Sequence, residues 1–151
     1  MISSEFWLYI FIGLILLNFI FSSVLEYIND KNWNDEIPDS LKDYYDSKKY
    51  STAKEYKKAR GRVSLISSSL SITITLIILI TGFYGYVSDY IYTIFSSHFL
   101  HSAIFFLFFY FLNMLVSIPI NYYSTFIIEE KFGFNKTTKK TFLADILKGT
   151  M

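Results

Sequence analysis

The sequence contains no cysteine, and this absence excludes disulfide bonds and every cysteine-based metal site or nucleophile. Only two prolines and six glycines occur among the 151 residues, so a disordered linker is not expected. Charged residues are scarce at 18%, whereas 52% of the residues are hydrophobic and 21% are aromatic. The net charge of +1 gives no electrostatic indication of nucleic-acid binding, and we expect no nucleic-acid partner.

The apolar residues gather in three long runs without Lys, Arg, Asp or Glu, at about residues 6–25, 65–87 and 99–120. A helix of about 20 apolar residues crosses a bilayer core, and backbone groups in lipid must bond within their own segment. We therefore expect an all-α, multi-pass membrane protein with three transmembrane helices. The first run follows no positive segment and exceeds the roughly 7–15 residues of a signal-peptide core, so we interpret it as a retained anchor.

The basic residues separate into two regions. Residues 26–64 hold nine of the 14 Lys and Arg residues and residues 121–151 hold the other five, whereas residues 88–97 hold none. Because Lys and Arg gather on the cytoplasmic side, the pattern places the N-terminus outside and both basic regions in the cytoplasm. The loop 26–64 should contain a helix that starts near Leu41, capped by Asp39 or Ser40. We favour a solvated flank for this basic stretch; the alternative is contact with anionic lipid heads or substrate.

Two of the spans carry small polar residues along one helical face. The second span has Ser64, Ser68, Ser71 and Thr75, and the third has Asn113, Ser117, Asn121 and Thr125. The spacing alone favours close helix packing with interhelical hydrogen bonds. The alternative is that these stripes line a water-filled cavity.

The end of the third span combines a helix breaker with acidic residues. Pro119 cannot donate a hydrogen bond to the carbonyl of Leu115, so the helix should kink or end there. Two adjacent carboxylates, Glu129 and Glu130, follow near the membrane boundary, where such groups are functional candidates.

A turn and a short helix are predicted after these carboxylates. Residues 133–135 read Gly-Phe-Asn, which favours a turn because Gly and Asn tolerate positive φ. Thr137 or Thr138 can then cap an amphipathic helix from about Lys139 to Lys148. Its apolar side would carry Phe142, Leu143, Ile146 and Leu147.

Residues 123–138 read YSTFIIEEKFGFNKTT, and Phe142, Asp145 and Lys148 continue the pattern. This string resembles the signature Y-x-x-F-x-I-E-E-K-x-G-F-N-x-x-T in the N-terminal region of type I CAAX prenyl proteases. The resemblance covers the whole chain and is strongest over residues 119–148. The matching candidate site residues, expected to make chamber or docking contacts, are Glu129, Glu130, Phe132, Gly133, Phe134, Asn135 and Thr138.

In that family, several membrane helices enclose a water-filled chamber, an H-E-x-x-H helix and a downstream Glu bind zinc, and prenylated CAAX peptides are substrates. The resemblance implies that residues 1–151 are the N-terminal membrane domain of a zinc metalloendopeptidase. Its partners would be membrane lipid and, through the full-length protein, a peptide substrate. The implied chamber favours the cavity interpretation over the packing interpretation for six polar residues: Ser68, Ser71, Thr75, Asn113, Ser117 and Asn121.

The sequence departs from the family in one decisive respect, because it has no H-E-x-x-H motif. Its only histidines, His98 and His101, are three residues apart and have no adjacent Glu, so we expect interfacial side chains. Catalytic zinc needs three protein ligands and an open position. We therefore expect no catalytic or metal-binding residue in this chain, zinc bound by a missing C-terminal part, and an inactive fragment. A stand-alone, non-catalytic three-span binding or structural protein is the alternative function.

Three roles for Glu129, Glu130 and Asn135 stay open at this point. They can orient a missing metal domain, contact the substrate backbone, or form a turn and ion pairs at the membrane edge. Neither carboxylate is expected to be the general base.

Overall fold

The computed structural model describes residues 3–33, 36–37, 44 and 46–149. Within this part of the chain, all regular structure is helical, which confirms the all-α prediction. The elements, in chain order, are α1 (Ser4–Lys31), α2 (Ser47–Ile80), α3 (Phe83–Ile94), α4 (His98–Tyr123), the π-helical segment η2 (Ser124–Glu129) and α5 (Lys139–Gly149). The helix start that we expected near Leu41, with Asp39 or Ser40 as its cap, lies outside the described residues.

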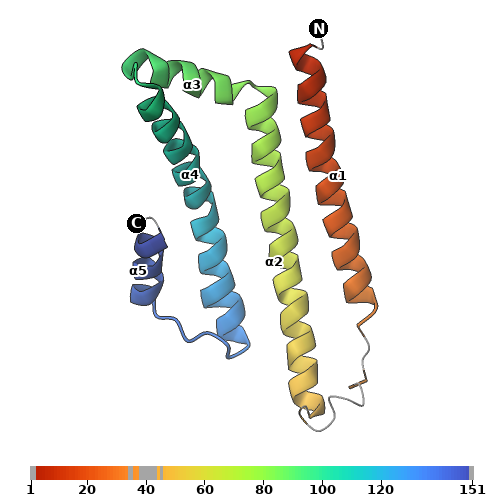
Figure 1. Cartoon of the computed structure of the whole chain (residues 1–151). Helices are drawn as coiled ribbons and strands as arrows, with labels where there is room; N and C mark the ends of the chain where they lie inside the picture. Colours follow the sequence, from red (N-terminus) through yellow and green to blue (C-terminus); the bar gives the residue numbers. More distant parts are fainter. Residues whose placement is uncertain (1–2, 34–35, 38–43, 45, 150–151) are drawn as a thin grey trace.

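Three of the helical stretches are long and apolar enough to cross a membrane: Glu5–Lys31, Ser47–Ile80 and His98–Glu129. The chain is therefore a multi-pass membrane protein, as predicted. Figure 1 shows α2 in the centre, with α1 on one side and α4 on the other. At 1.5 Å per residue, the 34 residues of α2 measure about 51 Å, well beyond a hydrocarbon core of about 30 Å.

The surplus length of α2 carries the basic residues from Lys48 to Arg62. Asp46 caps this helix, because its carboxylate accepts a hydrogen bond of 2.7 Å from the N–H of Lys49. The basic segment and the second span are thus one continuous helix. No boundary separates the cationic turns from the apolar ones.

The second span ends earlier than predicted, at Ile80 and not at Val87. Gly82 adopts a left-handed backbone with φ of +68°, which stops the helix after Thr81. A separate helix, α3, then occupies most of residues 88–97, the stretch without Lys or Arg between the second and third apolar runs. The prediction was wrong here because an uncharged run does not reveal a helix break inside it.

Helix α3 is too short to span a membrane and joins the ends of α2 and α4 (Figure 1). Val87 and Ile91, four residues apart, form its buried stripe. The Nε2 atom of His101 in α4 lies 3.1 Å from the carbonyl oxygen and 3.2 Å from the hydroxyl of Ser88. Helix α3 therefore connects the end of α2 to the beginning of α4 and contacts α4 through His101.

The third span does not end at Pro119, because α4 continues through it to Tyr123. Residues 124–129 then form the π-helical segment η2, a rare conformation that often occurs at functional sites. Ile128 in this segment is one of only three buried large apolar side chains in the described residues, with Val87 and Ile91. Most apolar surface of the described helices consequently needs lipid or additional protein to cover it.

Helix α5 folds back beside α4. The hydroxyl of Thr138 accepts a hydrogen bond of 3.1 Å from the N–H of Thr141, which confirms the predicted cap. Phe142 then packs with its ring centroid 5.5 Å from that of Phe126. The hydroxyl of Tyr110, in the middle of α4, donates a hydrogen bond of 2.6 Å to the carbonyl of Gly149.

Only half of the predicted apolar side of α5 is used for this packing. Phe142 and Ile146 are half-buried, whereas Leu143 and Leu147 remain 61% and 67% exposed.

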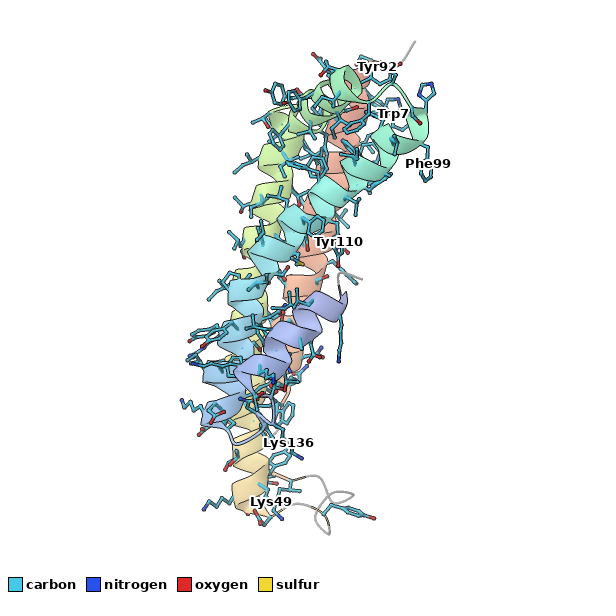
Figure 2. All side chains as sticks on the ribbon, turned by 90° about the vertical axis from the view of Figure 1, so that its left-hand side faces the viewer. Trp7, Lys49, Tyr92, Phe99, Tyr110 and Lys136 are labelled. Atoms are coloured by element: carbon cyan, nitrogen blue, oxygen red, sulfur yellow. The ribbon has the colours of Figure 1, made fainter. Side chains whose placement is uncertain are left out.

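The two ends of the molecule differ in character. Figure 2 shows Lys49 and Lys136 toward one end, and Trp7, Tyr92 and Phe99 at the other. We call the former the basic end. The beginning of α2 and the loop that precedes α5 both lie there, although they are far apart in the sequence (Figure 1).

Candidate functional site

The signature residues lie at the basic end, where η2 stops. Gly133 adopts φ of +74°, the left-handed conformation that glycine accepts without steric cost. The N–H of Phe134 donates to the carbonyl of Glu129 at 2.8 Å, and the N–H of Gly133 donates to the carbonyl of Glu130 at 3.0 Å. These two bonds form a Schellman cap, which satisfies carbonyl groups at the helix end. The predicted turn at residues 133–135 is therefore confirmed.

The turn is held against α2 by aromatic contacts. The ring of Tyr56 lies 4.6 Å from that of Phe134 and 5.6 Å from that of Phe132, measured between centroids. Edge-on and tilted contacts at these separations are favourable beyond the area that they bury. The turn therefore places both phenylalanine rings against α2.

An ion pair adds to this contact. The Nη1 atom of Arg60 lies 3.6 Å from Oε1 of Glu129 and also donates a hydrogen bond of 3.1 Å to the hydroxyl of Tyr56. The Glu129 side chain is only 25% exposed, whereas that of Arg60 is 53% exposed. We call these five residues the signature clasp: Tyr56, Arg60, Glu129, Phe132 and Phe134.

The second carboxylate stabilises the loop itself. The side-chain amide of Asn135 donates a hydrogen bond of 2.8 Å to Glu130, and its oxygen accepts one of 2.7 Å from the N–H of Thr137. The latter contact is the local turn that Asn side chains favour. Both carboxylates thus have partners within the chain. These contacts form a turn and an ion pair. The location at the membrane edge, and contacts with a metal domain or with substrate, stay predictions.

A charged hollow of about 390 Å³ lies next to the clasp, where α1, α2 and the end of α4 meet. Glu26 and Asp30 of α1 line it opposite Lys57 and Arg60 of α2. Lys57 lies 3.7 Å from Asp30 and 4.3 Å above the ring of Trp33. A Cβ atom on Gly61 would lie 3.1 Å from Glu26, so α1 and α2 approach closely at this glycine.

Two further hollows follow the polar stripes toward the opposite end. A serine hollow of about 380 Å³ between α1 and α2 is lined by Ser68, Ser71 and Thr75. An inner hollow of about 230 Å³ between α2 and α4 is lined by Ser71, Thr75 and Asn113. Asn121 lines the charged hollow. The structure thus brings five of the six predicted lining residues to hollows between the helices.

Two hydroxyl groups of these stripes bond within their own helices. Thr75 donates to the carbonyl of Ser71 at 2.9 Å, and Ser117 donates to the carbonyl of Asn113 at 2.8 Å. The interhelical hydrogen bonds of the packing interpretation are therefore not what occupies these two residues.

The sequence analysis missed a third polar stripe, on α1. Asn18, Ser22 and Glu26 line the serine hollow, and Asp30 lines the charged hollow. These four residues follow one another at steps of four, so the same helical periodicity that revealed the other stripes was present. We did not find it because the prediction of a span ended at Leu25, before the two carboxylates.

The described residues offer no set of ligands that fits a catalytic zinc ion. They contain no group of three or more His, Asp or Glu side chains in metal-binding proximity. His101 is bonded to Ser88, and its ring lies 5.7 Å from that of Tyr92. His98 and His101 lie at the start of α4, beside Tyr92 of α3; their interfacial location stays a prediction.

Residues 26–151 match the protein family described as CAAX prenyl protease N-terminal, five membrane helices. A probable CAAX prenyl protease 1 of Schizosaccharomyces pombe is 33% identical over 125 residues, which cover 74% of this chain. A CAAX prenyl protease 1 homolog of Dictyostelium discoideum is 27% identical over 125 residues, or 77% of this chain. These matches cover 26% and 28% of the two relatives, so the chain spans about a quarter of their length.

The fold has a counterpart among solved structures. The crystal structure of S. mikatae Ste24p superposes with a TM-score of 0.80 and 26% sequence identity. The superposition covers 95% of this chain and 35% of that chain. The arrangement of the helices, and not only the signature string, is therefore shared.

Proposed function

Since this chain belongs to the CAAX prenyl protease family through its N-terminal membrane region, we propose that it forms the membrane module of a zinc metalloendopeptidase. In the full-length protein this enzyme would cleave membrane-associated or prenylated peptides. The observation that supports the proposal is the signature clasp, because it gives Glu129 and Phe134 of the signature defined partners on α2.

We propose that the zinc ligands belong to the portion of the longer relatives that this chain does not span. When bound, zinc supplies a polarised water as the nucleophile for peptide hydrolysis. The described residues of this chain do not fit such a site. Their proposed contribution is to keep the membrane helices packed, to exclude lipid and to position the rest of the full-length protein.

The polar stripes are proposed to line part of a hydrated chamber. Support comes from the three adjoining hollows, since the charged and serine hollows share Glu26 and Ser67, and the serine and inner hollows share Ser71 and Thr75. Carboxylates, lysine and arginine at the edge of a bilayer are favourable only with water or partners nearby. A continuous polar track meets that requirement.

The clasp is proposed to dock the remainder of the enzyme by fixing the loop 130–138. Arg60 and Tyr56 fasten the end of η2 to α2, while Glu130 and Asn135 shape the loop that leads to α5. A loop fixed at both ends presents a constant surface to a following domain. This role needs no proton transfer by either carboxylate.

The test uses the full-length protein with Glu129→Gln and Glu130→Gln, and Glu55→Gln as the control, because Glu55 is exposed on α2. Cleavage of a farnesylated CAAX peptide and the yield of folded protein are measured for each variant. Docking predicts lower activity or yield for the first two variants only. If both retain full activity and yield, the docking role is wrong.

The proposed division of labour has its own measurement. The 151-residue chain, purified and supplied with zinc, should show no chelator-sensitive cleavage of that peptide. Chelator-sensitive cleavage by the isolated chain would overturn the proposed location of the zinc site.

A further inference from the structure

An apolar groove lies between α2, the end of α4 and η2, beside the charged hollow, with which it shares Val63 and Ile120. Its volume is about 640 Å³, and its floor is formed by Val63, Ile66 and Leu70 of α2 with Pro119 and Ile120 of α4. Along α2 it extends from Ala59 to Leu70, about 16 Å at 1.5 Å per residue. Ile66, Leu70, Pro119 and Ile120 lie at the basic ends of two of the apolar runs, so we expect lipid tails to reach this groove.

Two cations line the same groove at its basic end. Arg62 comes from α2, and Lys131 follows η2. No carboxylate lines the groove, and no ion pair within the described residues involves either cation. Two like charges that share a hollow repel each other, so an anion bound between them would relieve an unfavourable contact.

The neighbouring basic residues of α2 emphasise this difference. Lys49, Lys57 and Arg60 each have a carboxylate within 4.0 Å, at Asp46, Asp30 and Glu129. Arg62 and Lys131, by contrast, have no such ion pair among the described residues. An anionic group is what these two cations lack within that part of the chain.

We infer that this groove binds an anionic glycerophospholipid of the surrounding membrane. Its phosphate contacts Arg62 and Lys131, and one acyl chain lies along the floor formed by Val63, Ile66 and Leu70. The guanidinium group binds phosphate oxygens through two parallel hydrogen bonds, and the lysine adds a point charge. The combination of paired cations with an apolar channel is specific for an anion with a hydrocarbon tail.

The experiment places the 151-residue chain in nanodiscs of phosphatidylcholine containing a minority of phosphatidylglycerol, and native mass spectrometry counts the retained lipids. The wild-type chain should retain one phosphatidylglycerol in preference to phosphatidylcholine. Each cation near an anionic lipid contributes about fivefold in affinity, so the R62Q/K131Q variant should retain it about 25-fold less strongly. The K58Q/K139Q variant removes the same charge at two exposed positions outside the groove and should behave as wild type.

A third variant separates the groove from the charges. Ile66→Trp fills the floor and keeps both cations, so it should lower retention of long-chain phosphatidylglycerol but not of its dihexanoyl analogue. Circular dichroism verifies that each variant is folded. The inference is wrong if the wild-type chain shows no preference for the anionic lipid, if R62Q/K131Q and K58Q/K139Q lose it equally, or if Ile66→Trp has no effect.

Discussion

Gly133 determines where the signature loop leaves the membrane helices. Its φ of +74° allows the Schellman cap, and this cap directs Phe134 toward Tyr56. Any other L-residue at this position has its Cβ close to the following carbonyl, which costs about 1–2 kcal/mol. The backbone conformation and the aromatic contact therefore depend on the same residue.

We expect Gly133→Ala to lower the free energy of unfolding by about 1–2 kcal/mol, because alanine resists the left-handed conformation. Gly13→Ala is the matched control, since Gly13 lies inside α1 and a Cβ there meets nothing within 4 Å. Unfolding in detergent micelles, followed by circular dichroism, measures both. Equal stability of the two variants would contradict the assigned role of Gly133.

At the scale of single residues, much of this arrangement could be predicted. The Gly-Phe-Asn sequence predicted the turn, and Thr138 was one of two predicted caps. The partners of Glu129 could not be predicted, because Arg60 lies 69 positions earlier in the sequence and only the packing of η2 on α2 brings them together. Local rules specify turns and caps, but pairing across helices depends on the fold.

At the scale of elements, two boundaries could not be predicted from the sequence. The uncharged run from residue 65 to residue 87 contains the break at Gly82, which hydropathy does not register. The π-helical segment was also hidden, since it differs from an α-helix by one hydrogen-bond register and not by composition. In this segment Ser124, and not the predicted stripe residue Thr125, lines the charged hollow with Asn121.

Helix α5 combines an apolar contact with a polar edge. Phe142 packs on α4, while Thr141, Asp145 and Lys148 share another face at steps of four and three. The helix reaches back to Tyr110, the middle of the third span. Charged groups at that depth need water or partners, which supports the proposed hydrated chamber.

We expect Phe142→Ala to detach α5, because its ring contacts both Tyr122 and Phe126. Amide hydrogen exchange of residues 139–149 should accelerate about tenfold, as expected for a loss of about 1.4 kcal/mol in local stability. Leu143→Ala is the control, since Leu143 is 61% exposed on the same helix. A comparable acceleration in both variants would mean that Phe142 does not hold the helix in place.

At the scale of the whole molecule, hydropathy predicted the three spans because lipid imposes a length and a composition on every crossing segment. Hydropathy did not predict how the three spans pack against one another. The described helices bury few apolar side chains against one another, so the sequence contains little core pattern from which to infer neighbours. The stripe on α1 illustrates the same point, because its carboxylates Glu26 and Asp30 lie just past the apolar run.

The orientation of the chain in the membrane is predicted from the distribution of Lys and Arg over the whole molecule. Both lysine-rich regions approach the basic end, and α3 lies at the other end (Figures 1 and 2). Lysine and arginine are retained on the cytoplasmic side, so both regions should be cytoplasmic and α3 should face outward. The absence of native cysteine makes this directly measurable, because each introduced cysteine is the only one in the chain.

The exposed residues Lys58, Asp89 and Lys139 are suited to single cysteine substitutions in cells. A membrane-impermeant maleimide should label Asp89→Cys in intact cells, and it should label Lys58→Cys and Lys139→Cys only after permeabilisation. Both cytoplasmic positions must behave alike, since an even number of crossings separates them. If Lys58→Cys and Lys139→Cys are labelled from opposite faces, one of the long helices does not cross the bilayer, and the proposed lipid groove and hydrated chamber lose the membrane frame on which they depend.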